Sequence, residues 1–440
     1  MFDSPAICED VAEKLSNPNR VNQIAFHKAY SKKYQAEYWN DWTLGEGMAG
    51  LAYFYFMMEE AFPDRNWRQI GFDYLERALL SMQSRQITHY GLYQGLAGLG
   101  FVVSSVCPRE DRFKDFLAKL DHALVSQVEK CFLSKQSLYQ DESQFIPPSF
   151  YNLQDGLAGI IIYFLSRRED NYLRKLNYEC LDLLARLLIK EKADEKGMLP
   201  AWFTCYEHLS TLELKENFSG GAFFLNHLHG ITGSLSALSL ALIEGCETPS
   251  LHIAIHRIAN WLVTIHEFFG LSPSFPTAFS HENKDPLSSK ESLQNTWIGG
   301  WPAIMRSIYL AGKALQDTSL IVFAEKSYSK LFLDIEATAQ NNDPSFSLGL
   351  SGLLVTSSLM FESFKSSQII QKLNHLENQL KQLYHPNLPF GFSTSFLADS
   401  SELRSVHLPG LLHGASGVGL SILLLHKKIP ASLARIFLLT

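Results

Sequence analysis

The sequence lacks the cysteine spacing of a zinc site or of a small disulfide framework. Its six cysteines are scattered over 440 residues, and no two form a Cys-x-x-Cys pair. We therefore expect reduced, mostly buried thiols. The sequence also lacks a run of about 20 apolar residues, which a membrane-spanning helix needs. The first 20 residues include acidic residues and have no apolar core, unlike a signal peptide, so we expect a cytoplasmic protein.

A basic patch is missing as well. The formal net charge is −7, and no stretch of the sequence gathers a cluster of lysines and arginines. Proteins that bind nucleic acid usually carry a basic face, so this class is not favoured. What the sequence has in quantity is apolar material: 46% of its residues are hydrophobic, including 30 phenylalanines. This composition is typical of a globular protein with a large core.

One short motif, Gly-x-x-Gly, recurs along the chain, and each copy opens an apolar run. Its seven copies begin at Gly47, Gly95, Gly156, Gly230, Gly300, Gly349 and Gly414, the fifth having Ala303 as its last residue. Between copies lie amphipathic stretches, such as 72–80 and 173–187, with apolar residues three and four apart. Because glycine has no Cβ, helices that begin with this motif can crowd together at one end.

These repeats predict an all-α protein in which apolar inner helices are shielded by amphipathic outer helices. Seven such hairpins predict an α/α toroid, a double ring of about seven inner and seven outer helices, in a single domain over residues 1–440. No stretch alternates clearly enough to predict a β-strand. Three segments rich in proline or serine, 137–150, 270–294 and 384–409, precede the third, fifth and seventh motifs. We expect these loops at the motif end of the ring, the usual place for a binding site.

The residue before the first glycine of each motif should face the mouth of such a ring. In order these residues are Glu46, Gln94, Asp155, His229, Gly299, Leu348 and His413. Two histidines and two carboxylates at one mouth would form an acid–base set, and the helix N-termini would favour an anion beside them. As alternatives, the acids are N-cap-region residues and His413 is a rim histidine without a role. A metal site built from these four side chains is a less favoured possibility.

The motifs resemble those of the lanthionine synthetase C-like family, cyclases that make thioether rings in ribosomal peptides. The match runs from Leu44 to Leu425. The segment 228–230 keeps the His and Gly of the family's Ala-His-Gly element. The segment 295–302 keeps the Trp, Gly and Pro of the Trp-Cys-Tyr-Gly-x-Pro-Gly element, and 409–414 matches Pro-Gly-Leu-Leu-x-Gly. The resemblance implies the same toroid that the repeats predict.

The resemblance also implies a catalytic zinc held by two cysteines and one histidine, and here the sequence departs from the family. Ile298, Ser347 and Leu348 stand at the three ligand positions. Isoleucine and leucine have no lone pair to donate, and serine is a poor zinc ligand, so we expect no metal and no other cofactor. The family's acid after Tyr151 is Asn152, and its arginine four residues before Ile298 is Gln294.

The histidine of the family's Ala-His-Gly element is retained as His229. By resemblance it is the proton donor to the enolate that forms when a cysteine thiol adds to a dehydroamino acid. The set of expected catalytic residues is His229, Asp155, His413 and Glu46. Expected substrate-binding residues are Tyr151, Asn152, His227, Gln294 and Trp297, although Trp297 and Trp301 are also candidates for filling the former metal pocket.

The leading hypothesis is therefore a zinc-independent lanthionine-synthetase-C-like cyclase that acts on a dehydrated, ribosomally made precursor peptide. A free thiol is already partly ionised at neutral pH, so templating can accelerate the addition. The expected partners are this peptide and, in addition, a dehydratase and an export transporter. The alternative is a catalytically degenerate toroid that binds a precursor peptide or a partner modification enzyme. A toroid glycosidase with paired carboxylates ranks last, because few acids occupy the motif positions.

Overall fold

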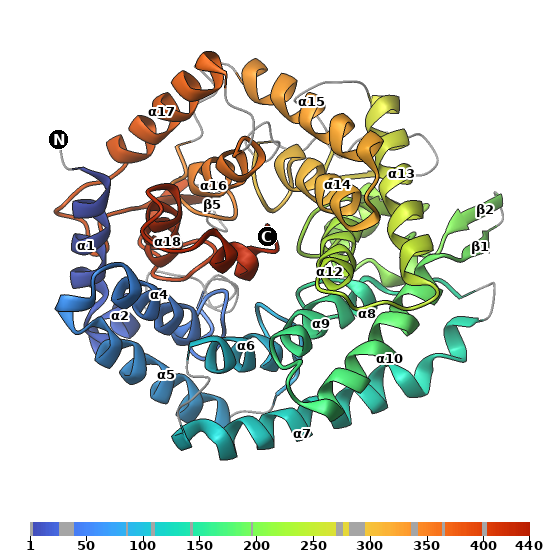
Figure 1. The fold of residues 1–440 in the computed structure, drawn as a ribbon, viewed down its shortest axis with the longest axis horizontal. Helices are drawn as coiled ribbons and strands as arrows, with labels where there is room; N and C mark the ends of the chain where they lie inside the picture. The colour runs from blue at the N-terminus through green and yellow to red at the C-terminus, as the bar shows by residue number, and fades with distance from the viewer. Residues whose placement is uncertain are drawn as a thin grey trace.

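The computed structural model describes residues 3–25, 39–84, 87–106, 111–140, 144–194, 197–269, 276–280, 295–335, 342–362, 366–397 and 403–440. Seven helices form an inner ring: α4 (Met48–Ala61), α6 (Leu96–Val106), α9 (Leu157–Ser166), α12 (Ile231–Ile243), α14 (Trp301–Leu315), α16 (Leu350–Met360) and α18 (Ala415–Leu425). Each packs against the next, and α18 packs against α4, which closes the ring (Figure 1). The expected α/α toroid is confirmed.

Seven outer helices surround the inner ring: α1 (Ser4–Leu15), α5 (Trp67–Gln83), α7 (Lys114–Cys131), α10 (Asn171–Leu188), α13 (Leu251–Phe269), α15 (Thr318–Asp334) and α17 (Ser367–Gln382). Six of them follow their inner partner directly in the chain. The seventh is α1, which comes from the opposite end of the chain and packs against α18 (Figure 1). The N-terminal helix thus completes the last hairpin.

The two rings differ in burial as their sequences predict. Every residue of α12 from Ile231 to Leu242 is buried, because this helix is covered on all sides. In α10 the apolar residues at helical spacing are buried, whereas Arg174, Lys175 and Glu179 are exposed. Apolar area removed from water stabilises a fold by roughly 25 cal/mol per Å², so the doubly covered inner helices provide much of the stabilisation.

The connections from each outer helix to the next inner helix carry further elements. They include α8 (Pro148–Tyr151), α11 (Leu212–Asn217), and three two-stranded antiparallel sheets: β1–β2 (Glu191–Asp194, Gly197–Pro200), β3–β4 (Ala222–Phe224, Ala278–Ser280) and β5–β6 (Thr394–Leu397, Leu403–Val406). The strands were not predicted, because they are too short to show an alternating pattern. In β3–β4, Phe223 pairs with Phe279, which links the loops before the fourth and fifth motifs. The helix α2 (Pro18–Ala25) follows α1.

The end of the chain fills the centre of the ring (Figure 1). After α18 the chain forms a short 3-10 helix, Ala431–Phe437, and continues to Thr440. Four consecutive residues, Ile436 to Leu439, have no exposed surface. Tyr93 donates its hydroxyl to the carbonyl of Ile436 (2.7 Å), and Arg306 donates from Nε and Nη2 to the carbonyl of Leu439 (2.8 and 2.6 Å). Inner-ring side chains therefore hold this segment in place.

Among the described helices, none combines the length and the apolar character that crossing a membrane requires.

Candidate functional site at the mouth of the ring

The seven loops that precede the motifs are joined by a closed circle of backbone hydrogen bonds, here called the mouth ring. The bonds run from Gly45 N to Tyr93 O, Leu92 N to Leu153 O, Leu153 N to Leu228 O, His227 N to Ile298 O, Ile298 N to Ser347 O, Ser347 N to Leu412 O, and Leu412 N to Gly45 O. Their lengths are 2.7 to 3.2 Å. The residues before each first glycine are therefore gathered at one end, as the repeats predict.

The last glycine of the motif allows neighbouring loops to come this close. A Cβ on Gly159 would overlap the carbonyl oxygen of Leu153 and would lie 2.6 Å from the backbone nitrogen of Leu92 in the neighbouring loop. Real side chains do not reach such contacts, so the backbone would have to move. The motif therefore serves the packing of the mouth ring, and not the chemistry directly.

Side chains four residues before the first glycine hold several loops in shape. Asn152 Oδ1 accepts hydrogen bonds from the backbone nitrogens of Asp155 (2.9 Å) and Gly156 (3.1 Å). Asn226 Oδ1 accepts one from the backbone nitrogen of His229 (2.7 Å). Asn152 is 3% exposed. Its amide is thus used to position Asp155, and it offers almost no surface to a ligand.

Glu46 and His413 form a buried pair on adjacent loops. Glu46 Oε1 lies 2.5 Å from His413 Nδ1 and accepts a hydrogen bond from the backbone nitrogen of His413 (3.1 Å). The Glu46 side chain is 2% exposed and that of His413 is 15% exposed. Glu46 Oε2 has no hydrogen-bonding partner among the described residues, and it packs so tightly against Gly410 that no Cβ fits there. The Glu46 carboxylate is therefore fixed in position. Nε2 of His413 lies on the edge of the imidazole that faces away from this carboxylate.

Burial and charge act in opposite directions on this pair. Burial raises the pKa of Glu46, and His413 partly opposes this rise. Burial by itself would lower the pKa of His413, but the negative charge and hydrogen bond of Glu46, together with the charge of Asp343, raise the pKa above its usual value. We expect His413 to be a stronger base than an isolated histidine.

Asp155 is the centre of a second group, which is more exposed. His89 Nδ1 lies 2.8 Å from Asp155 Oδ1, and this contact raises the pKa of His89. Desolvation by the surrounding protein lowers the pKa of His229, and the charge of Asp155 partly offsets that effect. Although many protein atoms surround His229, its side chain remains exposed to solvent. The mouth ring thus brings together all four expected catalytic residues in two groups, Glu46–His413 and Asp155–His229.

His89 is the residue that the motif pattern missed. It precedes the first glycine of its own motif by six residues, as Asp343 does in the sixth repeat. Each interacts with the motif residue of the following repeat: His89 contacts Asp155 through Nδ1, and the charge of Asp343 raises the pKa of His413. A comparison of positions six residues before each motif would have singled out both residues.

Three expected substrate-binding residues lie beneath the mouth ring. Tyr151, His227 and Trp297 are at most 1% exposed, so they present no surface to a ligand in this structure. Trp297 donates its Nε1 to the carbonyl of Phe437 (3.2 Å) and contacts the ring of His227 edge-on at a centroid distance of 5.0 Å. Their observed contacts are those of core residues. Gln294 lies outside the described residues.

Comparisons with known proteins agree with this architecture. A protein-family model described as "Lanthionine synthetase C-like protein" matches residues 38–438. The chain belongs to the lanthionine synthetase C-like family. The nisin biosynthesis protein NisC of Lactococcus lactis subsp. lactis is 19% identical over 291 residues, which are 64% of this chain and 66% of that protein. A solved structure of nisin cyclase has a TM-score of 0.71 and 17% identity, covering 96% of this chain and 97% of that one.

The residues at the family's zinc-ligand positions do not fit a zinc ion. Ile298 and Leu348 offer no donor atom, and the buried hydroxyl of Ser347 is a single weak donor without a hydrogen-bonding partner among the described residues. Within the same part of the chain, no three His, Cys, Asp or Glu side chains are arranged to hold a metal. Ile298 and Leu348 are half-buried, so this member of the lanthionine synthetase C-like family has an apolar wall at that place.

Proposed function

We propose that the protein is a zinc-independent cyclase that promotes the addition of cysteine thiols to dehydroamino acids in a ribosomally made precursor peptide. The observation that carries the proposal is the Glu46–His413 pair at the mouth ring. A histidine whose Nδ1 is held by a buried carboxylate is oriented as a general base. The pair would thus replace metal activation of the thiol by proton abstraction.

The proposed reaction balances its protons within this chain and the peptide. His413 takes the proton of the cysteine thiol, and the thiolate forms a C–S bond to the β-carbon of the dehydroamino acid. The electron pair of the C=C bond moves to give an enolate, and His229 in its imidazolium form donates a proton to the α-carbon, which leaves His229 neutral. Protonated His413 returns the proton to His229 through solvent, so that no proton is gained or lost overall.

The apolar wall makes a general base more necessary. Ile298 and Leu348 would disfavour a free thiolate beside them, because desolvation raises the pKa of a thiol. A zinc ion would overcome this effect directly. In this chain the thiol would approach uncharged and lose its proton to His413 during the attack, while the wall packs against the apolar part of the dehydroamino acid.

The test uses a synthetic peptide that contains one dehydroalanine and one cysteine a few residues away. Ring closure leaves the mass unchanged, so remaining thiols are alkylated with N-ethylmaleimide and counted by mass spectrometry. We expect faster closure than in buffer, insensitivity to a chelator, no zinc by elemental analysis, and a loss of roughly 100-fold or more in His413→Ala. His256→Ala is the matched control, because His256 is exposed on α13. Closure no faster and no differently patterned than in buffer would refute the enzymatic proposal.

The second candidate is a non-catalytic toroid that binds a precursor peptide or a partner modification enzyme. The burial of Trp297 beneath the mouth ring and the apolar wall favour it, because both remove features of a metal-dependent active site. This candidate predicts that the peptide binds without faster closure and that His413→Ala leaves its affinity unchanged. A dehydratase and an export transporter would be further partners in either case.

A further inference from the structure

A groove of about 740 Å³ runs between the outer helices α7 and α10. Its inner end reaches Ser104 and Ser166, at the C-terminal ends of α6 and α9, so this end lies toward the face of the toroid opposite the motif glycines. It follows α7 from Lys114 to Glu129, a stretch of roughly 22 Å at about 1.5 Å per residue. Its volume is within the range of ligand sites.

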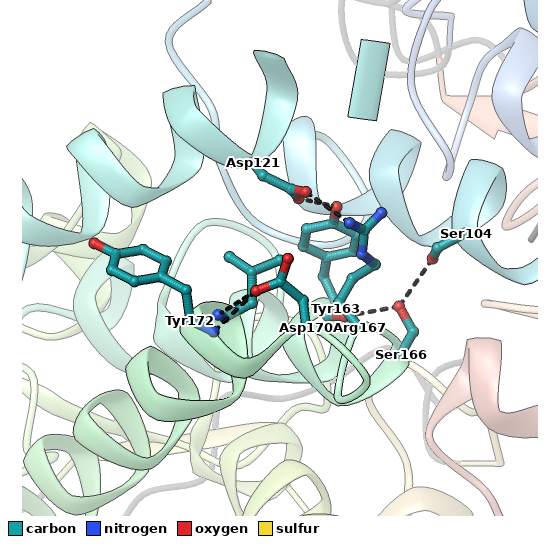
Figure 2. Close-up of polar contacts among 8 residues, drawn as sticks. Ser104, Asp121, Tyr163, Ser166, Arg167, Asp170 and Tyr172 are labelled. Carbon is teal, nitrogen blue, oxygen red and sulfur yellow. Dashed lines mark hydrogen bonds and ion pairs between the residues drawn. The ribbon is translucent and has the colours of Figure 1, made fainter. Parts of the chain in front are cut away.

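The floor of the groove is a preorganised polar network (Figure 2). Asp121 accepts hydrogen bonds from the hydroxyl of Tyr163 and from Nη2 of Arg167 (2.9 Å), and Ser104 and Ser166 share a hydrogen bond (2.9 Å). Burial raises the pKa of Asp121, while Tyr163 and Arg167 oppose the rise. Since these floor groups satisfy one another, recognition of an occupant depends on the walls and the rim.

The walls are apolar and the rim is acidic. Leu117, Val125 and Leu173 contribute to the walls, and Tyr172, 56% exposed, stands at the edge. Four lining residues are acids (Asp121, Glu129, Glu169 and Asp170) and two are cations (Lys114 and Arg167). Both cations are already paired, Lys114 with Asp111 (2.5 Å) and Arg167 with Asp121 (2.9 Å).

The unbalanced charge at the rim is therefore negative. Glu129 and Glu169 are both exposed there. Glu169 has one long contact with Arg168 (4.0 Å), and Arg168 lies closer to Glu244 (3.5 Å), so the balance at the rim stays negative. A second copy of this chain would carry the same net charge of −7, so it is a poor electrostatic match.

We propose that this groove binds an extended segment of a partner polypeptide in which apolar residues alternate with lysine or arginine. An extended chain advances about 3.3 Å per residue, so roughly seven residues span the groove. Successive side chains point to opposite sides, which directs apolar residues to the walls and cations to Glu129 and Glu169. A segment bound here leaves the mouth ring open. Binding in this groove is independent of the proposed cyclase activity.

The test measures binding of a fluorescent heptapeptide of alternating leucine and lysine by fluorescence polarisation, with full-length protein. The double variant Glu129→Lys/Glu169→Lys should bind about tenfold more weakly than wild type. The matched control is Glu213→Lys/Glu216→Lys, which reverses two exposed acids of α11 outside the groove. Both variants change the net charge from −7 to −3 (−7 + 4), so general attraction weakens equally in both.

Specific loss of binding in the groove variant, together with weak binding of the same peptide with glutamate for lysine, would support the proposal. Equal loss in both variants would show general attraction to an acidic protein and would overturn it. No measurable binding to wild type would overturn it as well. If spermidine competed with the peptide at equal affinity, the occupant would be a small cation and not a polypeptide, and the proposal would be overturned.

Discussion

At the residue scale, the buried pair and the exposed pair at the mouth ring are not equivalent. Solvent and salt screen the interaction of His89 with Asp155, whose side chains are 48% and 26% exposed. The Glu46–His413 pair is screened far less, because Glu46 is almost completely buried. We therefore assign the main effect on base strength to Glu46, and regard His89–Asp155 as a modulator of His229.

Glu46→Gln removes the charge of this carboxylate while keeping its size. Because the negative charge of Glu46 raises the pKa of His413, its loss should lower that pKa, although Asp343 continues to raise it. The rising limb of the pH–rate profile for ring closure should then move to lower pH. The rate above the limb should fall roughly 10- to 100-fold, because a weaker base is left. Glu213→Gln, which changes an exposed acid, is the control. If the rising limb of the pH–rate profile stayed at the same pH in Glu46→Gln, Glu46 would have no part in setting the base strength of His413.

His227→Leu should make folding less sensitive to acid. Burial lowers the pKa of His227 to about 3, whereas an unfolded histidine has a pKa near 6.5. Between these values the unfolded state binds a proton that the folded state cannot, so stability falls as the pH falls. From pH 7 to pH 5 the wild type should lose roughly 2 kcal/mol more than the variant.

Urea unfolding of both proteins at the two pH values measures this difference. The variant should fold, because the corresponding residues of four other repeats are leucines: Leu44, Leu92, Leu153 and Leu411. His266, whose pKa burial lowers to about 4, is present in both proteins, so its effect cancels. The same acid sensitivity in both proteins would contradict the assignment.

At the element scale, the C-terminal segment, residues 431–440, packs against the inner side of the mouth-ring loops. Phe437 stacks on Phe346 with a centroid distance of 3.4 Å, and its carbonyl accepts a hydrogen bond from Trp297. Trp297 in turn contacts the rings of Tyr93 and His227. One segment thus touches residues of the second, fourth, fifth and sixth repeats, which fixes their loops relative to one another.

Phe437→Ala should reduce the free energy of unfolding by about 3–5 kcal/mol, the usual cost of removing a buried phenylalanine ring. Phe268→Ala is the matched control, since Phe268 is 55% exposed on α13, and it should cost less than about 1 kcal/mol. Chemical denaturation at neutral pH gives both values. Similar costs for the two variants would mean that the segment does not stabilise the ring.

The inner and outer rings were predictable from the sequence because each repeat carries the same local motif. Helix α1 and the C-terminal segment, which close and fill the ring, carry no such motif. The glycine motifs placed the seven inner helices and the residues before each glycine, because these features depend on neighbours in the chain. The packing of α1 against α18 and the position of Phe437 depend on contacts hundreds of residues apart. The burial of Tyr151 and His227 was likewise not predictable, because a motif match does not reveal which side of a loop is buried, whereas packing was one of the two roles considered for Trp297.

At the scale of the whole molecule, ring closure depends on the two ends of the described chain. The helix α1 packs against α18, and its Ile7, Cys8 and Val11 are at most 1% exposed. Cys8 Sγ also donates to the carbonyl of Gly419 in α18 (3.4 Å). Unlike the other outer helices, α1 does not follow its inner partner directly in the chain, so non-covalent contacts alone hold it against α18.

Ile7→Ala should therefore lower the free energy of unfolding by about 2–5 kcal/mol. The control Ile253→Ala, on an outer-helix isoleucine that is 57% exposed, should change it by less than about 1 kcal/mol. Hydrogen exchange would show where the effect begins, with faster exchange in α1 and α18 than in α12. Uniform exchange around the ring would argue against a weak point at this closure.

The mouth ring is built only from backbone nitrogens and carbonyl oxygens, so the identity of the side chains beside it is largely independent of the frame that holds them. A glycine, a leucine, a glutamine, two acids and two histidines occupy equivalent places on it. One of these side chains can therefore be replaced by an apolar residue, an amide or an acid while the backbone hydrogen bonds of the mouth ring stay the same. The toroid is thus a scaffold with seven equivalent positions, and the side chain at each position can change without a change at the other six.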